Sequence, residues 1–289
     1  MNGKTEHRYW IHTVTPLHVG AGRGLGHIDL PIVREAVTNW PYIPGSSIKG
    51  VLADHFKAFA SDEKRKKGSW ERAAFGAPGD DVNGNNAGSL VFTDAHLLCL
   101  PVRSFYGTFA WVTSPFCLKR FDRDMGIDVS VKSFAEGTAS VCGASKLTDN
   151  SKIYLEDLDL TPKTSDEATA IARKIASTLF ADDEQWRNMF VERFVIVDDD
   201  IFSFLCENGT EVTPHVRISE TTGIVANGAL WYEEALPVET ILTGKVWCDR
   251  VYGDLRADDL MAHFANKKLK LQVGGKASTG KGLVSCVFE

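Results

Sequence analysis

Short runs of apolar, aromatic and β-branched residues recur along the chain and predict a fold rich in strands. The run at 8–14, RYWIHTV, ends at Thr15-Pro16 and is typical of a strand. Residues 213–231 carry Asn227-Gly228 between extended stretches, which predicts a hairpin. The same kind of pattern predicts further strands at 90–100, 107–112, 194–197, 240–247, 268–273 and 283–288.

Helical spacing of apolar residues predicts three helices, at 45–59, 165–180 and 258–265. Ser46 or Ser47 is the expected N-cap of the first helix. Polar stretches at 61–67 and 76–89 are interpreted as surface insertions, and 122–150 has no clear period. Strands and helices that alternate irregularly, with long insertions, favour an α+β sheet over a doubly wound parallel sheet.

A glycine-rich segment, Gly20–Gly26, follows the first predicted strand. It has no GxGxxG register and leads into an extended piece with Pro31, so it is not a dinucleotide-binding loop. Histidines, an arginine and a carboxylate surround it, a set that suits proton transfer or a metal at a phosphodiester. The alternative is that Asp29 only forms a turn or a cap. The residues concerned are His18, Arg23, His27 and Asp29.

A second glycine-rich segment, Gly275–Gly282, is one residue short of a phosphate-binding P-loop. Gly282 replaces the hydroxyl residue that would hold Mg²⁺, and a strand is predicted to follow where a P-loop needs a helix. We therefore expect no nucleotide cofactor here. Backbone N–H groups together with Lys276 and Lys281 suit a phosphate, whereas a tight hairpin that needs positive φ explains the glycines equally well.

Composition narrows the class of protein. The chain has 289 residues, of which 44% are hydrophobic and 24% charged, so it is globular and forms one large or two ordinary domains. No apolar run reaches the ~20 residues of a membrane span, and the polar segment 1–9 is no secretory signal, which predicts a cytoplasmic protein. The six cysteines are scattered, so we expect reduced thiols and no zinc site.

Two further features have a plain and a functional interpretation. Asp198-Asp199-Asp200 is better explained as a helix start or a solvated turn than as a metal site. Trp231 and Tyr232 suit packing within the hairpin better than stacking on bases, although aromatic side chains serve both roles.

Net charge is −6, but its distribution is uneven. From Lys267 onward five lysines stand against Glu289 alone, giving +4, while the rest of the chain has 27 basic and 37 acidic residues, or −10. Cations gathered on one face are what a polyanion needs, whatever the average charge. A basic terminus is also common as a solvated surface.

Several segments in order carry a resemblance to a known family. They are TPLHVGAG at 15–22, GHIDLPIVRE at 26–35, PGSSIKG at 44–50, VFTDA at 91–95, GALWYEEALP at 228–237 and the terminal glycine segment. This set resembles the RAMP superfamily, and within it the repeating backbone subunits (subunit four) of type III-B CRISPR Cmr effector complexes. The resemblance runs from about residue 10 to 288 and is weakest between 119 and 193.

The resemblance implies a single domain over 1–289 with a modified RRM-like (ferredoxin-like) palm built from both ends of the chain. It implies finger insertions at about 55–90 and 119–193 and a β-hairpin thumb at about 213–231. Members of this kind stack along a CRISPR RNA (crRNA) with other Cmr subunits and cut a complementary target RNA at regular intervals. We expect no membrane association.

The resemblance also assigns roles to residues. Asp29 falls on the catalytic aspartate of an endoribonuclease whose reaction resembles transesterification by the RNA 2′-OH with a divalent cation, Mg²⁺ foremost. Asp29 is then a metal ligand, an orienting group or the base, and the metal ligands are otherwise unknown. The alternative is a purely structural crRNA-binding scaffold subunit without nuclease activity. The expected RNA-binding residues are His18, Arg23, Ser46, Ser47, Lys49, Lys276 and Lys281.

Overall fold

The computed structural model describes residues 6–22, 24, 26–66, 68–77, 86–126, 137–149, 151–219, 223–251 and 255–289. Its helices are α1 (Gly45–His55), α2 (Asp62–Arg65), α3 (Trp70–Phe75), α4 (Pro115–Met125), α5 (Asp166–Leu179), α6 (Glu184–Arg193), α7 (Asp199–Asn208) and α8 (Ala257–Phe264), with a 3₁₀ turn at Ala277–Thr279. Its strands are β1 (Glu6–Thr13), β2 (Tyr42–Ile43), β3 (Leu90–Phe92), β4 (Ala95–Arg103), β5 (Phe109–Thr113), β6 (Thr138–Val141), β7 (Ile153–Leu155), β8 (Leu158–Thr164), β9 (Phe194–Ile196), β10 (Glu211–Ile218), β11 (Val225–Ala235), β12 (Ile241–Cys248), β13 (Lys268–Gln272) and β14 (Leu283–Phe288).

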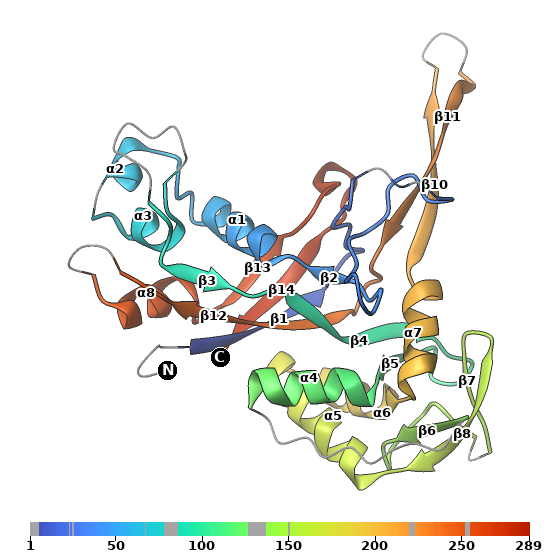
Figure 1. The fold of residues 1–289 in the computed structure, drawn as a ribbon. Helices are drawn as coiled ribbons and strands as arrows, with labels where there is room; N and C mark the ends of the chain where they lie inside the picture. Colours follow the sequence, from blue (N-terminus) through green and yellow to red (C-terminus); the bar gives the residue numbers. More distant parts are fainter. Residues whose placement is uncertain are drawn as a thin grey trace.

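The palm is an antiparallel sheet in which β1 lies between β12 and β14, and β4 pairs with the other edge of β12 (Figure 1). In chain order β1, α1, β4, β12, α8 and β14 form the β-α-β-β-α-β unit of ferredoxin-like folds. The spatial order β14-β1-β12-β4 is the one that this unit produces. The predicted α+β fold with a ferredoxin-like palm is confirmed.

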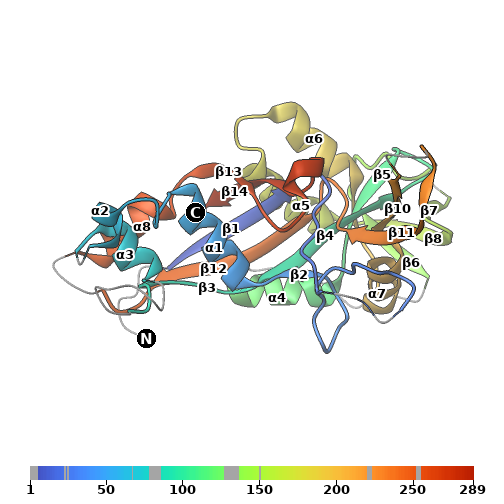
Figure 2. The same cartoon turned by 90° about the horizontal axis from the view of Figure 1, so that it is seen from above.

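Both faces of the palm sheet are buried. Successive residues of a strand point to opposite faces, so each strand contributes side chains to both cores. Tyr9 and Ile11 of β1 belong to the same apolar core as Leu52 of α1 and Phe264 of α8. Trp10 points to the other face, where its ring packs against Phe121 of α4 with centroids 5.2 Å apart. Helices α1 and α4 accordingly lie on opposite sides of the sheet (Figures 1 and 2).

Beyond β4 the sheet continues through β5, β9, β6, β8 and β7 into a second region of the molecule. Helices α5 and α6 pack against each other and against this part of the sheet. The amphipathic helix predicted at 165–180 is present as α5, and the Ser165 side chain caps it by accepting from the Ala168 N–H.

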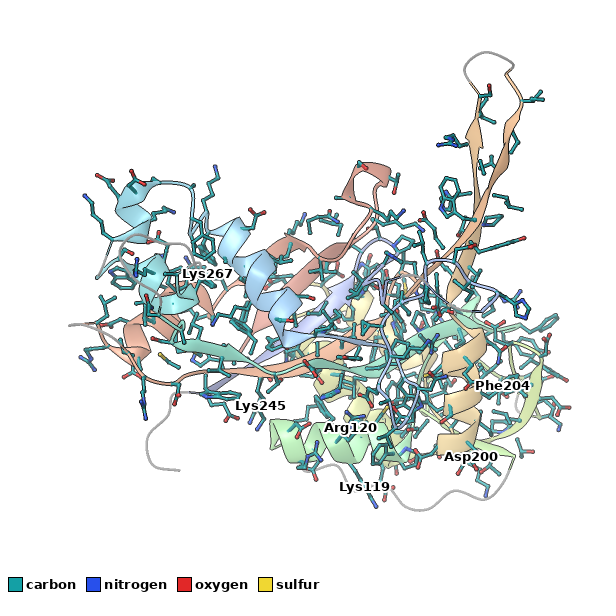
Figure 3. All side chains as sticks on the ribbon, turned by 45° about the horizontal axis from the view of Figure 1, so that its top comes forward. Lys119, Arg120, Asp200, Phe204, Lys245 and Lys267 are labelled. Atoms are coloured by element: carbon teal, nitrogen blue, oxygen red, sulfur yellow. The ribbon has the colours of Figure 1, made fainter. Side chains whose placement is uncertain are left out.

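The hairpin β10–β11 leaves the body and projects away from it (Figure 1). Cross-strand pairs such as Val216 with Leu230 and Pro214 with Tyr232 place apolar groups on one of its faces. Val216 is 47% and Leu230 54% exposed. Figure 3 shows little else packed around the upper half of this thumb hairpin.

Some predicted boundaries were wrong. Helix α1 is capped by Pro44 and not by Ser46 or Ser47, because the Asp94 carboxylate accepts from the Gly45 N–H at 2.8 Å and takes over the capping. The helix ends at His55, four residues earlier than predicted. The strand predicted at 90–100 is two strands, β3 and β4. Thr93 and Asp94 lie between them, where the Asp94 side chain reaches the start of α1.

Helix α4, which ends inside the region without a clear period, and the short strand β6 within that region were not predicted. Asp198 caps α7 by accepting from the Asp200 N–H, so the acidic triplet is a helix start. All six cysteines are buried and none of them forms a disulfide in the described part of the chain, as expected for thiols. No helix in the described ranges is both long and apolar enough to cross a membrane.

Candidate nucleic-acid interface

The N-terminal glycine segment folds back on itself and docks on β11. The Ala21 N–H donates to the Pro31 carbonyl at 2.9 Å, which pairs the two arms of the loop. The Leu30 N–H then donates to the Tyr232 carbonyl at 3.1 Å, and the Glu234 N–H donates to the Leu30 carbonyl at 3.0 Å. The loop thus forms an extra edge on the base of the thumb hairpin.

Asp29 lies where this loop meets the hairpin, with its side chain exposed. Its Oδ2 accepts from the Tyr232 N–H at 2.8 Å. Among the described residues no hydrogen bond to its Oδ1 is found. His27 is also exposed, and Arg23 lies outside the described residues.

His18 is buried, with 6% of its surface exposed, between the N-terminal loop and the C-terminal glycine segment. Its Nδ1 lies 2.6 Å from the Glu234 carbonyl, and its own carbonyl accepts from the Gly275 N–H at 2.8 Å. Gly274 has φ +74°, and a Cβ there would lie 2.3 Å from the His18 carbonyl oxygen. The fold therefore brings the two glycine segments into direct contact, at a position that needs glycine.

The two lysines of the C-terminal segment converge on Glu233 of β11. The Lys276 Nζ lies 2.6 Å from Oε1 and the Lys281 Nζ 3.7 Å from Oε2. The Trp231 Nε1 donates to Oε1 at 2.8 Å, and the His215 Nε2 lies 3.4 Å from Oε2. Burial disfavours the charge, but the hydrogen bonds from Lys276 and Trp231 and the nearby His215 outweigh it and lower the pKa of Glu233 to about 2.

Glu234, on the opposite face of the same strand, holds the segment that follows Asp29. Its Oε1 accepts from Arg34 at 2.5 Å and from the Thr210 hydroxyl at 2.9 Å, and its Oε2 accepts from the Ile32 N–H at 3.0 Å. A parallel bridge between Leu30 and Glu233 sets the register of this segment against β11.

Glu35 anchors the far end of this segment to the palm. Arg120 of α4 (Figure 3) donates to both of its oxygens, at 2.9 and 2.8 Å, and His96 lies 2.7 Å away. Burial raises the pKa of Glu35, but the bonds with His96, Arg120 and Thr38 prevail and lower it to about 2.

The residues predicted at the start of α1 lie on a separate element. Ser46 is exposed and Ser47 half-buried. The Lys49 Nζ donates to the Leu90 carbonyl at 2.8 Å, and burial lowers the pKa of this ammonium group. In the free chain Lys49 is thus bonded to the protein itself.

The remaining C-terminal lysines behave differently from Lys276 and Lys281. Lys267, Lys268 and Lys270 are exposed, on or next to β13. That strand forms an edge of the sheet, and lysines on an edge strand also protect it from pairing with other chains.

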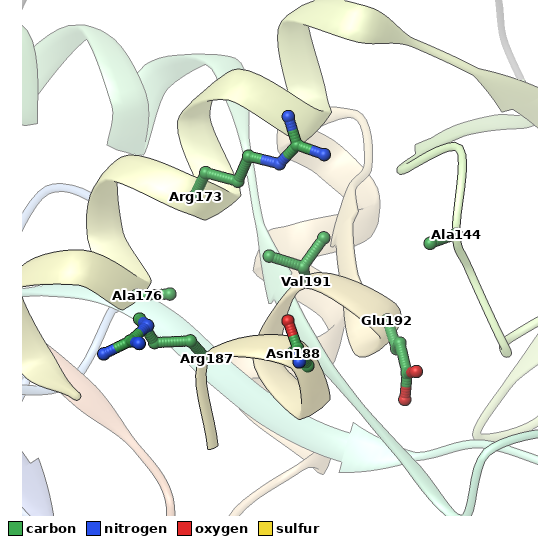
Figure 4. A pocket seen from close by; sticks show the side chains of 7 residues that line it. All are labelled: Ala144, Arg173, Ala176, Arg187, Asn188, Val191 and Glu192. Carbon is green, nitrogen blue, oxygen red and sulfur yellow. The ribbon is translucent and has the colours of Figure 1, made fainter. Parts of the chain in front are cut away.

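A shallow pocket of about 410 Å³ lies apart from these loops, beside α5 and α6 (Figure 4). Its polar lining includes Arg173, Arg187 and Glu192. Arg187 is committed to the end of α5, because it donates to the Phe180 carbonyl at 3.0 Å. Glu192 is paired with Lys146 at 2.8 Å.

Comparison with known proteins identifies the family. The RAMP superfamily model matches residues 10–285. The chain belongs to the RAMP superfamily. Among its RAMP relatives, the CRISPR system Cmr endoribonuclease Cmr4 of Pyrococcus furiosus is 33% identical, over 96% of this chain and 94% of that protein. The CRISPR system CMR subunit Cmr4 of Saccharolobus solfataricus is 23% identical over the same shares.

Solved RAMP structures have the same fold. The crystal structure of oligomeric Cmr4 from Pyrococcus furiosus superposes with a TM-score of 0.73 at 25% identity, covering 99% of both chains. A chain of the type III-B Cmr-beta complex bound to cognate target RNA gives a TM-score of 0.74 at 22% identity, covering 98% of this chain and 97% of that one. The family predicted from the sequence motifs is confirmed.

Proposed function

We propose that this chain is a backbone subunit of a type III-B CRISPR effector complex, which binds crRNA and cleaves complementary target RNA at regular intervals. The observation that carries the proposal is the meeting of two loops on β11. One presents an exposed carboxylate, Asp29, and the other carries Lys276 and Lys281. The relative from Pyrococcus furiosus, named an endoribonuclease, supports the same activity.

Asp29 is the proposed catalytic residue. Its Oδ2 is fixed by the Tyr232 N–H, which orients the carboxylate and leaves Oδ1 for the RNA. In a transesterification the 2′-oxygen attacks the adjacent phosphorus and loses its proton, while the P–O5′ bond breaks and the leaving 5′-oxygen takes up a proton from solvent. We propose that Oδ1 accepts the 2′-OH proton or orients the hydroxyl, and a positioned base typically contributes 10²–10⁴-fold.

A divalent cation fits this site only together with RNA. No group of three or more His, Cys, Asp or Glu that could hold a metal occurs in the described part of the chain. Mg²⁺ commonly binds through one or two carboxylates and substrate phosphates, keeping several waters. Asp29 Oδ1 would be the protein ligand, and the cation would stabilise charge on the phosphate oxygens.

The guide-binding residues follow from the same arrangement. We propose that His18, buried beneath both loops, fixes their spacing, and that Arg23 supplies a cation that binds the RNA backbone. Ser46, Ser47 and Lys49 at the start of α1 are proposed to hold further phosphates. Binding would require Lys49 to leave the Leu90 carbonyl.

The proposal includes a single domain with fingers at about 55–90 and 119–193 and β10–β11 as the thumb. Its partners are crRNA, target RNA, further copies of the chain in a helical stack and other Cmr subunits, in the cytoplasm. The oligomeric state named for the crystallised relative supports self-association.

The decisive experiment compares Asp29→Asn with Asp29→Ala in assembled complexes. The asparagine oxygen still accepts from the Tyr232 N–H, so the loop keeps its bond while the charge is lost. We expect Asp29→Asn to reduce periodic cleavage at least about 100-fold with unchanged target binding, measured on labelled target RNA. Cleavage at the wild-type rate would show that Asp29 is not catalytic.

One observation favours the second candidate, a scaffold without nuclease activity. The recorded side-chain bond of Asp29 is to the backbone of Tyr232, which is what a structural cap does. A scaffold predicts that only Asp29→Ala, which removes this bond, disturbs RNA binding, and that no variant changes cleavage. The pair of variants therefore separates the two functions.

A further inference from the structure

Glu233 has more partners than a single carboxylate needs. Its side chain is 3% exposed, and Lys276, Lys281, Trp231 and His215 all lie within 3.7 Å of its oxygens. A buried carboxylate left with no cation would be costly, but this one keeps neighbours if any single group leaves. The cluster is therefore built so that one member can be exchanged.

Lys276 is the member that can leave. Its side chain is 33% exposed, whereas that of Lys281 is 13% exposed. Lys281 also lies close enough to Glu211 for its charge to lower the pKa of that carboxyl group, which burial otherwise raises. Lys281 is thus paired with Glu233 and also acts on the charge of Glu211, whereas Glu233 is the ion-pair partner of Lys276 among the described residues.

The backbone under Lys276 need not move for this exchange. The preceding residue, Gly275, is bonded to the His18 carbonyl, and the Lys276 carbonyl accepts from the Thr279 N–H at 3.0 Å. A change of side-chain rotamer is enough to turn the ammonium group from the protein interior toward solvent. A backbone phosphate carries one negative charge, as does the carboxylate it would replace, and its oxygens accept charge-assisted hydrogen bonds from an ammonium group.

We propose that Lys276 is an exchangeable cation, held by Glu233 in the free chain and transferred to a backbone phosphate of bound RNA. The inference rests on the proposed function and deepens it, because it makes Glu233 the residue that masks the RNA-binding loop. Free subunits then have weak nonspecific attraction to RNA, because Glu233 competes with phosphate for Lys276. In an assembled stack the many phosphate contacts together outweigh this competition. Trp231 belongs to β11 and His215 to β10, and both lie next to Glu233. The departure of Lys276 therefore changes the surroundings of residues at the base of the thumb hairpin.

The test measures binding of the purified chain to a fluorescent single-stranded RNA by anisotropy over a range of KCl concentrations. Glu233→Gln keeps the shape and the bond from Trp231 but releases Lys276. We expect binding to tighten roughly three- to tenfold, with the salt slope steeper by about 0.7, the value for one further phosphate contact on a single strand. Lys276→Ala added to Glu233→Gln removes this gain.

Glu156→Gln is the matched control. It makes the same change in net charge and releases Arg103, which is paired with Glu156 in the turn between β7 and β8. We expect no change in RNA affinity from it. An equal gain in this control would show that net charge alone explains the effect and would overturn the proposal.

Other outcomes are equally informative. Unchanged or weaker binding by a folded Glu233→Gln would mean that Glu233 only positions Lys276, which ends the masking proposal and leaves the proposed function intact. If neither the wild type nor the variant binds RNA, both proposals fail. Should circular dichroism show that Glu233→Gln is unfolded, Glu233→Asp decides instead, since it shortens the carboxylate and must also tighten binding.

Discussion

Glu35 is where the segment after Asp29 is tied to the palm, through Arg120 and His96. Its pKa is lowered from 4.5 to about 2 in the folded chain. A carboxylate with a lowered folded pKa contributes stability that is fully present above the unfolded value. That stability is lost as the pH falls from about 4.5 toward 2.

We predict that Glu35→Gln lowers the free energy of unfolding at pH 7 by roughly 2 kcal/mol, because it removes the charge that Arg120 and His96 bind. The variant should also lose less of its remaining stability between pH 4.5 and 3 than the wild type does. Urea unfolding at these pH values measures both effects.

The control is Glu6→Gln, which removes a carboxylate that is 47% exposed and paired with Lys245 at the surface. It should cost less than about 1 kcal/mol. Parallel loss of stability by wild type and Glu35→Gln below pH 4.5 would mean that Glu35 does not carry the acid sensitivity.

At the residue scale, sequence reasoning named the groups but not their partners. Motifs pointed to Asp29, Lys276 and Lys281 because charge near glycine segments is visible in one dimension. That Glu233 pairs with Lys276 depends on a contact across 43 positions, which no local pattern contains. The burial of His18 has the same origin, because it follows from the docking of one loop on the other.

At the scale of elements, the contact between the two glycine segments depends on the shape of the C-terminal hairpin. Gly274 has φ +74° and leaves no room for a Cβ beside the His18 carbonyl. Gly280 has φ +81° but open space around it. Both positions have a positive φ, so replacing either glycine by alanine strains the backbone. They differ in packing, and the two substitutions therefore make a matched pair.

We predict that Gly274→Ala destabilises the chain by about 2 kcal/mol more than Gly280→Ala, because only the first forces the loops apart. It should also weaken RNA binding, since Lys276 moves with the loop. Chemical denaturation and RNA anisotropy measure the two effects. Equal costs for both variants would show that the close approach at His18 is relaxed cheaply.

Element types were largely predictable, whereas caps and junctions were not. The N-cap residue of α1 is Pro44, and the first free N–H, that of Gly45, is bonded by Asp94, 49 positions away, so the serines next to the helix gave the wrong expectation. Helix α4 had good signals, with Ser114 as N-cap, Pro115 in the first turn and Gly126 in a left-handed conformation. It was missed because Ser114 follows the last residue of β5 directly, without a loop to separate them.

At the scale of the whole molecule, the thumb hairpin projects from the body, and little of the rest of the described chain packs against its outer half. A two-stranded hairpin with exposed apolar residues is marginal alone and is expected to gain contacts in an assembly. The apolar pair Val216 and Leu230 stands on its exposed face.

We predict that Val216→Ser combined with Leu230→Ser changes the thermal stability of the body little but weakens assembly of the chain on long single-stranded RNA several-fold. Sedimentation velocity measures the assembly. Val37→Ser, at a turn residue that is 96% exposed, is the control and should assemble normally. Normal assembly by the double variant would mean that the apolar face of the thumb makes no contact between subunits or with RNA.

The position of β1 between β12 and β14 has a consequence for biosynthesis. Both strands that pair with β1 come from residues 241–288, so its backbone partners are made last by the ribosome. For most of translation β1, which contains aromatic residues, therefore has no partner strand. Such a nascent chain is prone to aggregation, and strand pairing over so long a sequence separation forms slowly. Helper proteins that shield nascent chains should therefore engage this subunit early, and its yield in cells should depend on them.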